Sequence, residues 1–436
     1  MTPTPLRDHA LTGPWRRGLV WAILWLASLA EAQPLSATSA AASRPRDMGH
    51  AGDAGHAGHA GRAPPGCTST ALACASAAMP FIDARGTLWV VWVAGGAVST
   101  ARSSDGGRSF TPAVEIGRHG SLLDLGADAK PQIVVDAKGR AVVAYGVFKD
   151  KQWNAQIMVS TSMDGGVSFS APRSLSPDGA SQRFPALAAD GNGTVVATWL
   201  DKRTAAAARK QGLAQAGAAV AYARSIDGGA TFVAESIAQD HSCECCRLAM
   251  AFDPQRRPVV LFRGIFDGRE RDHAVTTFST AGEAGPAYRV AADHWAIDAC
   301  PHHGPSLAVT ADGSFQAAWF TQGQARQGMF YARSTDGGRT FSSPQAVGNA
   351  EQQAGRPFLL AKGDAVWLVW KEFDGKRIFI KERKSRDAGR SWSDDRLIAE
   401  TAGYADHPVL VNDERHVYLS WMTRDEGYRL MILDEL

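Results

Sequence analysis

The sequence contains two groups of residues with the chemistry of metal ligands. Three cysteines lie within four positions, and a Cys-Pro-His-His segment follows further along the chain. Thiolates and imidazoles are preferred by soft and borderline ions such as Cu(I) and Zn(II). We therefore predict a transition-metal or redox site, copper before zinc, with the ligands Cys243, Cys245, Cys246 and Cys300 and with His302 or His303.

The same cysteines admit two other interpretations. The chain has six cysteines, an even number, and an oxidising compartment would allow all of them to form disulfides. One bridge would join Cys67 to Cys74, and the later cysteines would form the others. Inert thiols are the remaining alternative, and the sequence leaves all three open.

Three arginines could bind an anion. Arg183, Arg247 and Arg356 each stand directly before an apolar residue or a proline at the start of a β-rich run. A guanidinium group matches the geometry of a carboxylate and can bind it with two parallel hydrogen bonds. If the fold brings these residues together, they form a clamp for a small anionic ligand.

The elements that must position these groups are repeated. Seven β-runs each end in an aromatic residue, at intervals of 51 to 63 residues. A fixed period of this length is typical of propellers and other repeat folds. The aromatic residues are Trp92, Tyr145, Trp199, Phe262, Trp319, Trp370 and Trp421.

A second motif follows most of these runs. Five octets have the pattern Ser-x-Asp-(Gly/Ala)-Gly-x-x-(Phe/Trp), at residues 103–110, 162–169, 225–232, 334–341 and 385–392. The aspartate can accept backbone N–H groups across a tight turn, and the glycines allow positive φ. We interpret each octet as a hairpin clasp with a structural role.

These octets are Asp boxes, and the chain from about residue 78 onward resembles the sialidase-like family of β-propellers. The resemblance implies an all-β fold of four-stranded antiparallel blades around a channel. The repeats predict seven blades, with six as the alternative because sialidases have six. We expect a degenerate turn near residues 279–285 in blade four, and an outer strand for blade seven supplied by the segment after Cys67.

In a propeller, the residues that lead into the inner strands gather around one mouth of the channel. Here these residues include the cysteines, histidines and arginines named above. We also expect Arg271-Asp272-His273 to be an ion pair in a solvated loop, and Asp406-His407 to be a structural pair.

The resemblance to sialidases also implies a glycosidase alternative. Members of that family hold the substrate carboxylate with three arginines, and they use a Tyr-Glu pair as nucleophile. By this comparison Tyr404 would be the nucleophile, Glu244 its partner, and Arg183, Arg247 and Arg356 the clamp. The first inner strand departs from the family pattern, since Ala78-Met79-Pro80 stands where the family has Arg-Ile-Pro.

The N-terminal region predicts export. Arg16 and Arg17 precede an apolar run and a small-x-small site at Ala30 to Ala32, so residues 1–32 are predicted to be a cleaved signal peptide. We expect residues 33–66 to form a disordered His/Ala/Gly-rich leader, in which His50, His56 and His59 could capture a metal ion. The propeller then occupies residues 67–436, in the periplasm or outside the cell.

Composition excludes other classes of function. The 46 basic and 44 acidic residues give a net charge of +2, with no basic stretch suited to nucleic acid. No segment of the mature chain is long and apolar enough to span a membrane. The leading hypothesis is thus a metal-binding or redox propeller; the alternatives are a sialidase-like hydrolase or anionic-sugar binder, and a scaffold for a protein partner.

Overall fold

The computed structural model describes residues 66–435 apart from residues 127, 214, 216, 234, 298 and 300. The predicted signal peptide, nearly all of the predicted leader with its histidines, and Cys300 lie outside the described residues. All elements below belong to the described part.

The first four blades are four-stranded antiparallel sheets in which successive strands are neighbours. Blade one contains β1 (Ala77–Ile82), β2 (Leu88–Ala94), β3 (Ala97–Ser103) and β4 (Val114–Arg118). Blade two contains β5 (Gln132–Val135), β6 (Ala141–Phe148), β7 (Ala155–Ser162) and β8 (Arg173–Ser174). Blade three contains β9 (Gln182–Ala189), β10 (Val195–Asp201), β11 (Ala218–Ser225) and β12 (Ser236–Ser242), with helix α1 (Arg203–Lys210) between β10 and β11. Blade four contains β13 (Ala249–Phe252), β14 (Pro258–Arg263), β15 (His273–Phe278) and β16 (Ala284–Arg289).

Two further blades have the same order, and the last is shorter. Blade five contains β17 (Ser306–Val309), β18 (Phe315–Gln322), β19 (Gln327–Ser334) and β20 (Gln345–Val347). Blade six contains β21 (Gly355–Lys362), β22 (Ala365–Phe373), β23 (Ile378–Ser385) and β24 (Arg396–Thr401). Blade seven contains β25 (Val409–Asn412), β26 (His416–Thr423) and β27 (Gly427–Glu435). Short 3-10 turns lie at η2 (Leu72–Cys74), η3 (Gly120–Leu122) and η4 (Ala350–Gln352).

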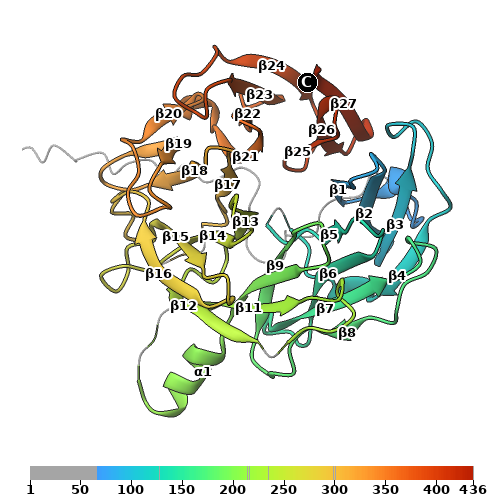
Figure 1. The fold of residues 1–436 in the computed structure, drawn as a ribbon, viewed down its shortest axis with the longest axis horizontal. Helices are drawn as coiled ribbons and strands as arrows, with labels where there is room; N and C mark the ends of the chain where they lie inside the picture. Colours follow the sequence, from blue (N-terminus) through green and yellow to red (C-terminus); the bar gives the residue numbers. More distant parts are fainter. Residues whose placement is uncertain are drawn as a thin grey trace, which may run out of the picture. The chain divides into compact units, whose positions relative to one another are not determined.

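The seven blades form a closed ring (Figure 1). Each inner strand contacts the inner strand of the next blade, from β1 and β5 through to β21 and β25, and β25 contacts β1. The prediction of seven blades is confirmed, and the six-blade alternative is wrong. The degenerate turn of blade four is also confirmed, because β15 and β16 are joined by a tight turn in which Ser279 N donates to Glu283 O at 2.8 Å.

Closure differs from the prediction. Blade seven has three strands among the described residues, and the segment after Cys67 supplies no fourth strand. That segment forms η2, which contacts β2 and β27, and the predicted Cys67–Cys74 disulfide is present. A bridge between residues only seven positions apart favours a tight turn over an extended strand.

The hydrophobic core is divided into layers between neighbouring blades. The second strand of each blade is almost fully buried, and its terminal aromatic residue is at most 2% exposed. Trp199, for example, packs with residues of β6 and β7 from the preceding blade. The prediction that these aromatic residues form the core is confirmed, and burial of successive blades against each other is what stabilises the ring.

The Asp boxes are hairpin clasps, as predicted. In blade five, Ser334 Oγ donates to Asp336 Oδ1 at 2.8 Å and accepts from Gly338 N at 2.9 Å. Hydrogen bonds from the side chain and backbone of Thr340 lower the pKa of Asp336 to about 2. In blade three the box is also tied to the preceding blade, since Arg140 Nη1 donates to Asp227 O at 2.8 Å.

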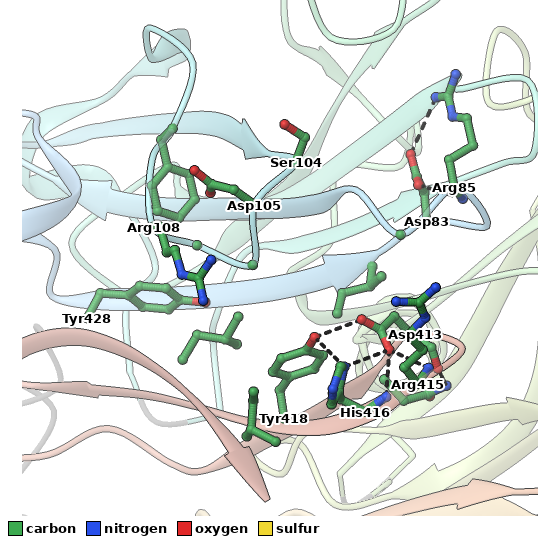
Figure 2. A pocket seen from close by; sticks show the side chains of 18 of the residues that line it. Asp83, Arg85, Ser104, Asp105, Arg108, Asp413, Arg415, His416, Tyr418 and Tyr428 are labelled. Atoms are coloured by element: carbon green, nitrogen blue, oxygen red, sulfur yellow. Dashed lines mark hydrogen bonds and ion pairs between the residues drawn. The ribbon is translucent and has the colours of Figure 1, made fainter. Parts of the chain in front are cut away.

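A cavity of about 1500 Å³ lies at the seam between blades one and seven (Figure 2). It is lined by the β1–β2 turn, the first Asp box and the β25–β26 turn, where Tyr418 donates to Asp413 at 2.7 Å. These turns lie at the end of the blades opposite to the residues that lead into the inner strands. None of the predicted site residues lines this cavity.

Candidate functional site

The residues that lead into the inner strands meet at one end of the channel, which we call the mouth. Its centre is the carboxylate of Asp128, in the segment before β5, whose side chain is 1% exposed. Arg247, before β13, donates from Nη1 to Asp128 Oδ1 at 2.8 Å. Arg356, on β21, places Nη1 3.6 Å from Asp128 Oδ2, and Gly304 N, from the segment before β17, donates to the same oxygen at 3.3 Å. Blades two, four, five and six therefore converge on one carboxylate.

Local backbone geometry directs the side chains of Arg356 and Arg247 toward the mouth. Arg356 has φ 59°, and the pairing register of β21 shifts between Gly355 and Phe358, so the strand carries a bulge. A bulge bends a strand and redirects a side chain. Gly304 lies against the stem of Arg247, since a Cβ built at that glycine would be 2.1 Å from Arg247 Cγ. Glycine is thus required where Arg247 crosses the backbone.

Blade seven adds a second group of polar residues to the mouth. Lys130 Nζ lies 2.8 Å from Asp406 Oδ2 and donates to His407 O at 3.1 Å. Burial lowers the pKa of Lys130, although Asp406 opposes this change. The prediction of a structural pair agrees with the observed contacts, because Asp406 Oδ1 accepts from the backbone N of His407 at 2.7 Å.

The imidazole of His407 lies among basic side chains. Burial holds its pKa well below the ordinary value, and positive charge on four neighbours acts in the same direction. A buried imidazole with this surrounding is neutral at physiological pH. The four neighbours are Arg356, Lys371, Lys130 and Arg247.

Arg183 belongs to the same face but binds a different carboxylate. Its Nε and Nη2 both lie 2.7 Å from the oxygens of Asp124, in a two-bond pair. The guanidinium group also lies over the rings of Phe184 and Phe148, at 4.4 and 5.3 Å from the centroids. The three predicted clamp arginines are therefore divided, with two on Asp128 and one on Asp124.

The residues assigned to the glycosidase alternative lie on loops. Tyr404 precedes β25 and is 39% exposed. Glu244 lies between β12 and β13, where its Oε2 is 2.6 Å from Lys202 Nζ. This contact joins the loop after β10 to the segment before β13, so both open onto the same face, as predicted.

The three cysteines between β12 and β13 form a compact buried cluster. Cys243 Sγ lies 3.4 Å from Cys245 Sγ and 3.8 Å from Cys246 Sγ, and the three sulfur atoms all lie within 4.8 Å of one another. Each residue is at most 2% exposed. These separations exclude a bridge from Cys243 to Cys245 or Cys246, whereas the predicted pairing with Cys300 involves a residue outside the described part, and the grouping of the three sulfur atoms could hold a metal ion.

Two arginines lie beside this thiol cluster. Arg271 Nη1 donates to Cys243 Sγ at 3.4 Å. Hydrogen bonds from Cys245 and Cys246 hold the pKa of Cys243 well below its ordinary value, and Arg263 and Arg271 lower it further against the effect of burial. Burial raises the pKa of Cys246. Of these two thiols, Cys243 is the more readily ionised.

The expectation of a solvated ion pair at residues 271–273 is wrong. Asp272 and His273 are at most 1% exposed, because the segment leads directly into β15. Asp272 accepts from Arg289 Nε at 2.9 Å and from the backbone N of Asp293 at 2.9 Å. This segment belongs to the buried surroundings of the thiol cluster.

The backbone carbonyl oxygens of His302 and His303 accept hydrogen bonds from two arginines. Arg356 donates to His302 O, and Arg263 Nη2 donates to His303 O at 2.9 Å. The His303 ring stacks on Phe320 with centroids 4.1 Å apart. Among the described residues, the group of closely spaced metal donors contains the three thiols without either histidine.

Comparison with known proteins adds information about the fold. No family model and no curated protein matches the sequence. An ulvan lyase of polysaccharide lyase family PL25, bound to -[GlcA(1-4)Rha3S]-, superposes with a TM-score of 0.53 at 11% identity, covering 86% of this chain and 94% of its own. The polysaccharide lyase Uly1 has a TM-score of 0.50 at 8% identity, with coverage of 80% and 88%. A Hadza microbial sialidase, Hz136, has a TM-score of 0.49 at 16% identity, with coverage of 79% and 76%.

The chain has the fold of the two polysaccharide lyases. At such low identities the likeness concerns fold alone. The predicted resemblance to sialidase-like propellers is confirmed at that level, and the function must come from the site itself.

Sequence reasoning missed three residues of the site, Asp124, Asp128 and Arg263. The two aspartates stand in the segment leading into β5, where a carboxylate just before an inner strand was a usable signal. Arg263 directly follows Phe262, the aromatic residue that ends the fourth repeated β-run. A charged residue at the end of a fully buried strand could therefore have identified Arg263 from the sequence.

Proposed function

We propose that the protein binds an acidic carbohydrate at the mouth of the channel. The observation that carries the proposal is the convergence of Arg247 and Arg356, from different blades, on the carboxylate of Asp128. This geometry already accommodates a carboxylate, and the neighbouring Lys130 and Lys371 add further positive charge around His407. A sugar acid could therefore bind beside Asp128 or replace its contacts.

The comparisons support the class of ligand. The ulvan lyase with the same fold was solved with -[GlcA(1-4)Rha3S]-. Propellers bind ligands at the channel opening because loops from several blades meet there. The mouth of this chain is such an opening, and Arg247, Arg356 and Lys130 give it a basic lining.

The test is calorimetric titration of the protein with sodium glucuronate, N-acetylneuraminate and neutral glucose. We expect the acids to bind and glucose not to bind. Arg356→Ala should weaken acid binding at least tenfold, whereas Arg256→Ala, at an exposed turn of blade four, should not change it. Equal binding of glucose and glucuronate, or no binding of either acid, would contradict the proposal.

A more specific form of this proposal is that the protein hydrolyses the acidic carbohydrate that it binds. Tyr404 would act as nucleophile with Glu244 as its partner, and the exposure of Tyr404 at 39% is compatible with access to a substrate. Turnover of a fluorogenic sialoside by the wild type but not by Tyr404→Phe would support this role. Binding of acids without turnover would leave a carbohydrate-binding protein.

A second candidate function is transition-metal binding, favoured by the compact thiol cluster of Cys243, Cys245 and Cys246. Copper or zinc are the candidates, since both accept thiolate ligands. In this proposal Cys300, His302 and His303 remain possible additional ligands, and the His-rich leader acts as a capture arm. Metal analysis of the protein purified without chelators, with thiols counted on the same sample, tests it: about one ion per chain is expected.

We also propose export, based on the predicted signal peptide at residues 1–32, to the periplasm or the exterior. Within the described residues, no helix has the length and apolar character to cross a membrane. N-terminal sequencing of the mature protein would test cleavage after residue 32. A role as a scaffold for a protein partner stays the remaining alternative.

A further inference from the structure

The turn between β6 and β7 exposes a tryptophan. Trp153 is 43% exposed, whereas tryptophans that end the second strands, such as Trp92 and Trp199, are at most 1% exposed. Its backbone has φ 62°, in the left-handed region that bulky side chains rarely adopt. An exposed indole ring and a strained backbone both cost free energy, and backbone strain is concentrated at functional sites. The turn is therefore a candidate for contact with a ligand.

Hydrogen bonds hold this turn in one conformation. Asp150 Oδ1 accepts from the backbone N of Gln152 at 2.9 Å and from the backbone N of Asn154 at 3.1 Å. Asn154 Nδ2 donates to Asp150 Oδ2 at 2.8 Å, and Lys149 N donates to Asn154 O at 2.7 Å. Because the turn is already ordered, a ligand that contacts Trp153 does not have to order it on binding.

Contacts on its inner side fix the position of the indole ring. The Trp153 ring meets the Phe148 ring in a T-shaped contact, with centroids 5.0 Å apart. The guanidinium group of Arg183 lies 5.3 Å from the centroid of the same Phe148 ring, and its two hydrogen bonds to Asp124 hold it there. A continuous series of contacts therefore connects Trp153 to Asp124.

Asp124 relates this turn to the centre of the mouth. Its backbone N donates to Gly146 O at 3.0 Å, so the end of β6 lies beside the segment that leads into β5. Asp128, which Arg247 and Arg356 contact, stands four residues further along the same segment. Trp153 is therefore at the rim of the mouth, on blade two.

The chemistry around Trp153 suits a sugar. The turn consists of Lys149-Asp150-Lys151-Gln152-Trp153-Asn154, and Lys151 is exposed. One aromatic ring among charged and amide groups does not make the contiguous apolar patch that marks a protein interface. A sugar ring has an apolar face of C–H groups and a polar edge, so it can pack on an indole while its edge stays hydrated. Positive charge on Lys151 favours an acidic sugar.

We infer that Trp153 stacks on the sugar ring next to the one bound at Asp128, so that the ligand of the mouth is an acidic oligosaccharide or polysaccharide. The inference deepens the acidic-carbohydrate proposal and rests on it. Arg247 and Arg356 recognise the carboxylate of one sugar, and Trp153 recognises the continuation of the chain.

The test is calorimetric titration of the full chain with glucuronate and with a (1-4)-linked tetramer of glucuronate. The wild type should bind the tetramer at least about tenfold more tightly than the monomer, because a well-placed aromatic contact contributes about this factor. The four equivalent sugars of the tetramer by themselves account for a gain of about fourfold. Only a larger gain indicates a contact beyond the first sugar.

Variants assign this gain to the indole ring. Trp153→Ala should reduce the gain to about fourfold and leave the affinity for glucuronate within about twofold of the wild type. Trp153→Phe keeps an aromatic ring and should retain most of the gain. The matched control is Ile226→Ala, at a residue that is 72% exposed in the Asp box of blade three, at the opposite end of the blades. It should change neither affinity.

A second measurement detects the contact in the wild type. N-bromosuccinimide oxidises exposed indole rings, and mass spectrometry locates the modified residue. The tetramer should protect Trp153 from oxidation, whereas glucuronate should not, because the monomer occupies only the position at Asp128. This assay decides the question if Trp153→Ala does not fold by circular dichroism.

The outcomes separate this inference from the proposed function. If neither glucuronate nor the tetramer binds, the proposed function fails and the inference fails with it. If glucuronate binds and Trp153→Ala retains the full gain for the tetramer, or the wild type shows no gain beyond about fourfold, only the inference fails. An equal loss of both affinities in folded Trp153→Ala would show a structural role for the ring and would also overturn it.

Discussion

Arg247 binds the carboxylate of Asp128, 119 residues away in sequence, and directly follows Cys246 of the thiol cluster. One short segment before β13 therefore contributes to both candidate sites. Its cysteines lie buried between β12 and β13, while its arginine extends to the mouth of the channel. The two sites share backbone but use different side chains, so they can be tested independently.

Asp128→Asn should increase the affinity of the mouth for external carboxylates. The substitution removes the internal anion bound by Arg247 and Arg356 and leaves their guanidinium groups available to a ligand. We expect glucuronate to bind about tenfold tighter, a gain of about 1.4 kcal/mol. Loss of one partner of a buried ion pair should also lower the free energy of unfolding by about 3 kcal/mol. Calorimetry and urea denaturation measure the two effects, and weaker glucuronate binding by a folded variant would contradict the prediction.

Stability should decrease as pH falls below about 6.5. Burial holds the pKa of His273 and His407 well below the ordinary value in the folded protein, so the unfolded chain binds protons first. Each histidine then lowers the free energy of unfolding by up to about 1.4 kcal/mol per pH unit, from about pH 6.5 down to its folded pKa. Denaturation at pH 7.5, 6.5 and 5.5 measures the slope. His273→Phe should reduce it by the contribution of one proton, and an unchanged slope would show that His273 does not titrate as expected.

Two glycines at the same position of different Asp boxes should differ in their tolerance of alanine. Gly229 has φ 91°, and a Cβ there would lie 2.1 Å from Val142 Cγ2 of the preceding blade. Gly107 has φ 85°, and a Cβ there would have Leu88 Cδ2 as its closest neighbour, at 3.4 Å. Both substitutions incur backbone strain, but only Gly229→Ala also overpacks, at an additional cost of about 1–3 kcal/mol. Equal free energies of unfolding for the two variants would contradict this prediction.

Removal of the Cys67–Cys74 bridge should lower stability by about 2 kcal/mol, because a short loop loses little entropy when it is closed. The bridge holds η2 against β2 and β27, where Trp92 Nε1 donates to Thr70 O at 2.9 Å. The double variant Cys67→Ser/Cys74→Ser should show this loss and faster hydrogen exchange at the seam of blades one and seven. The control is the wild type under reducing conditions. A double variant with the same free energy of unfolding as the oxidised wild type would contradict this prediction.

Much of the architecture was predictable from sequence because it depends on short-range chemistry. The aromatic ends of the second strands, such as Trp199 and Trp319, and the Asp-box turns each involve residues within a few positions of one another. Their periodic recurrence predicts seven blades, and ring closure then follows from the need of each blade to bury both faces. The Cys67–Cys74 bridge, between near neighbours, was predictable for the same reason.

Which chemical groups reach the mouth is already fixed by their order along the chain, because the position of a residue relative to its inner strand sets the end of the channel at which it lies. Their binding partners, in contrast, depend on the packing of the folded chain. Arg247 and Arg356 share Asp128 rather than joining Arg183, because these contacts depend on how blades far apart in sequence pack. Burial and long-range pairing set the charge state of a group, so the chemistry of the site emerged only with the closed ring.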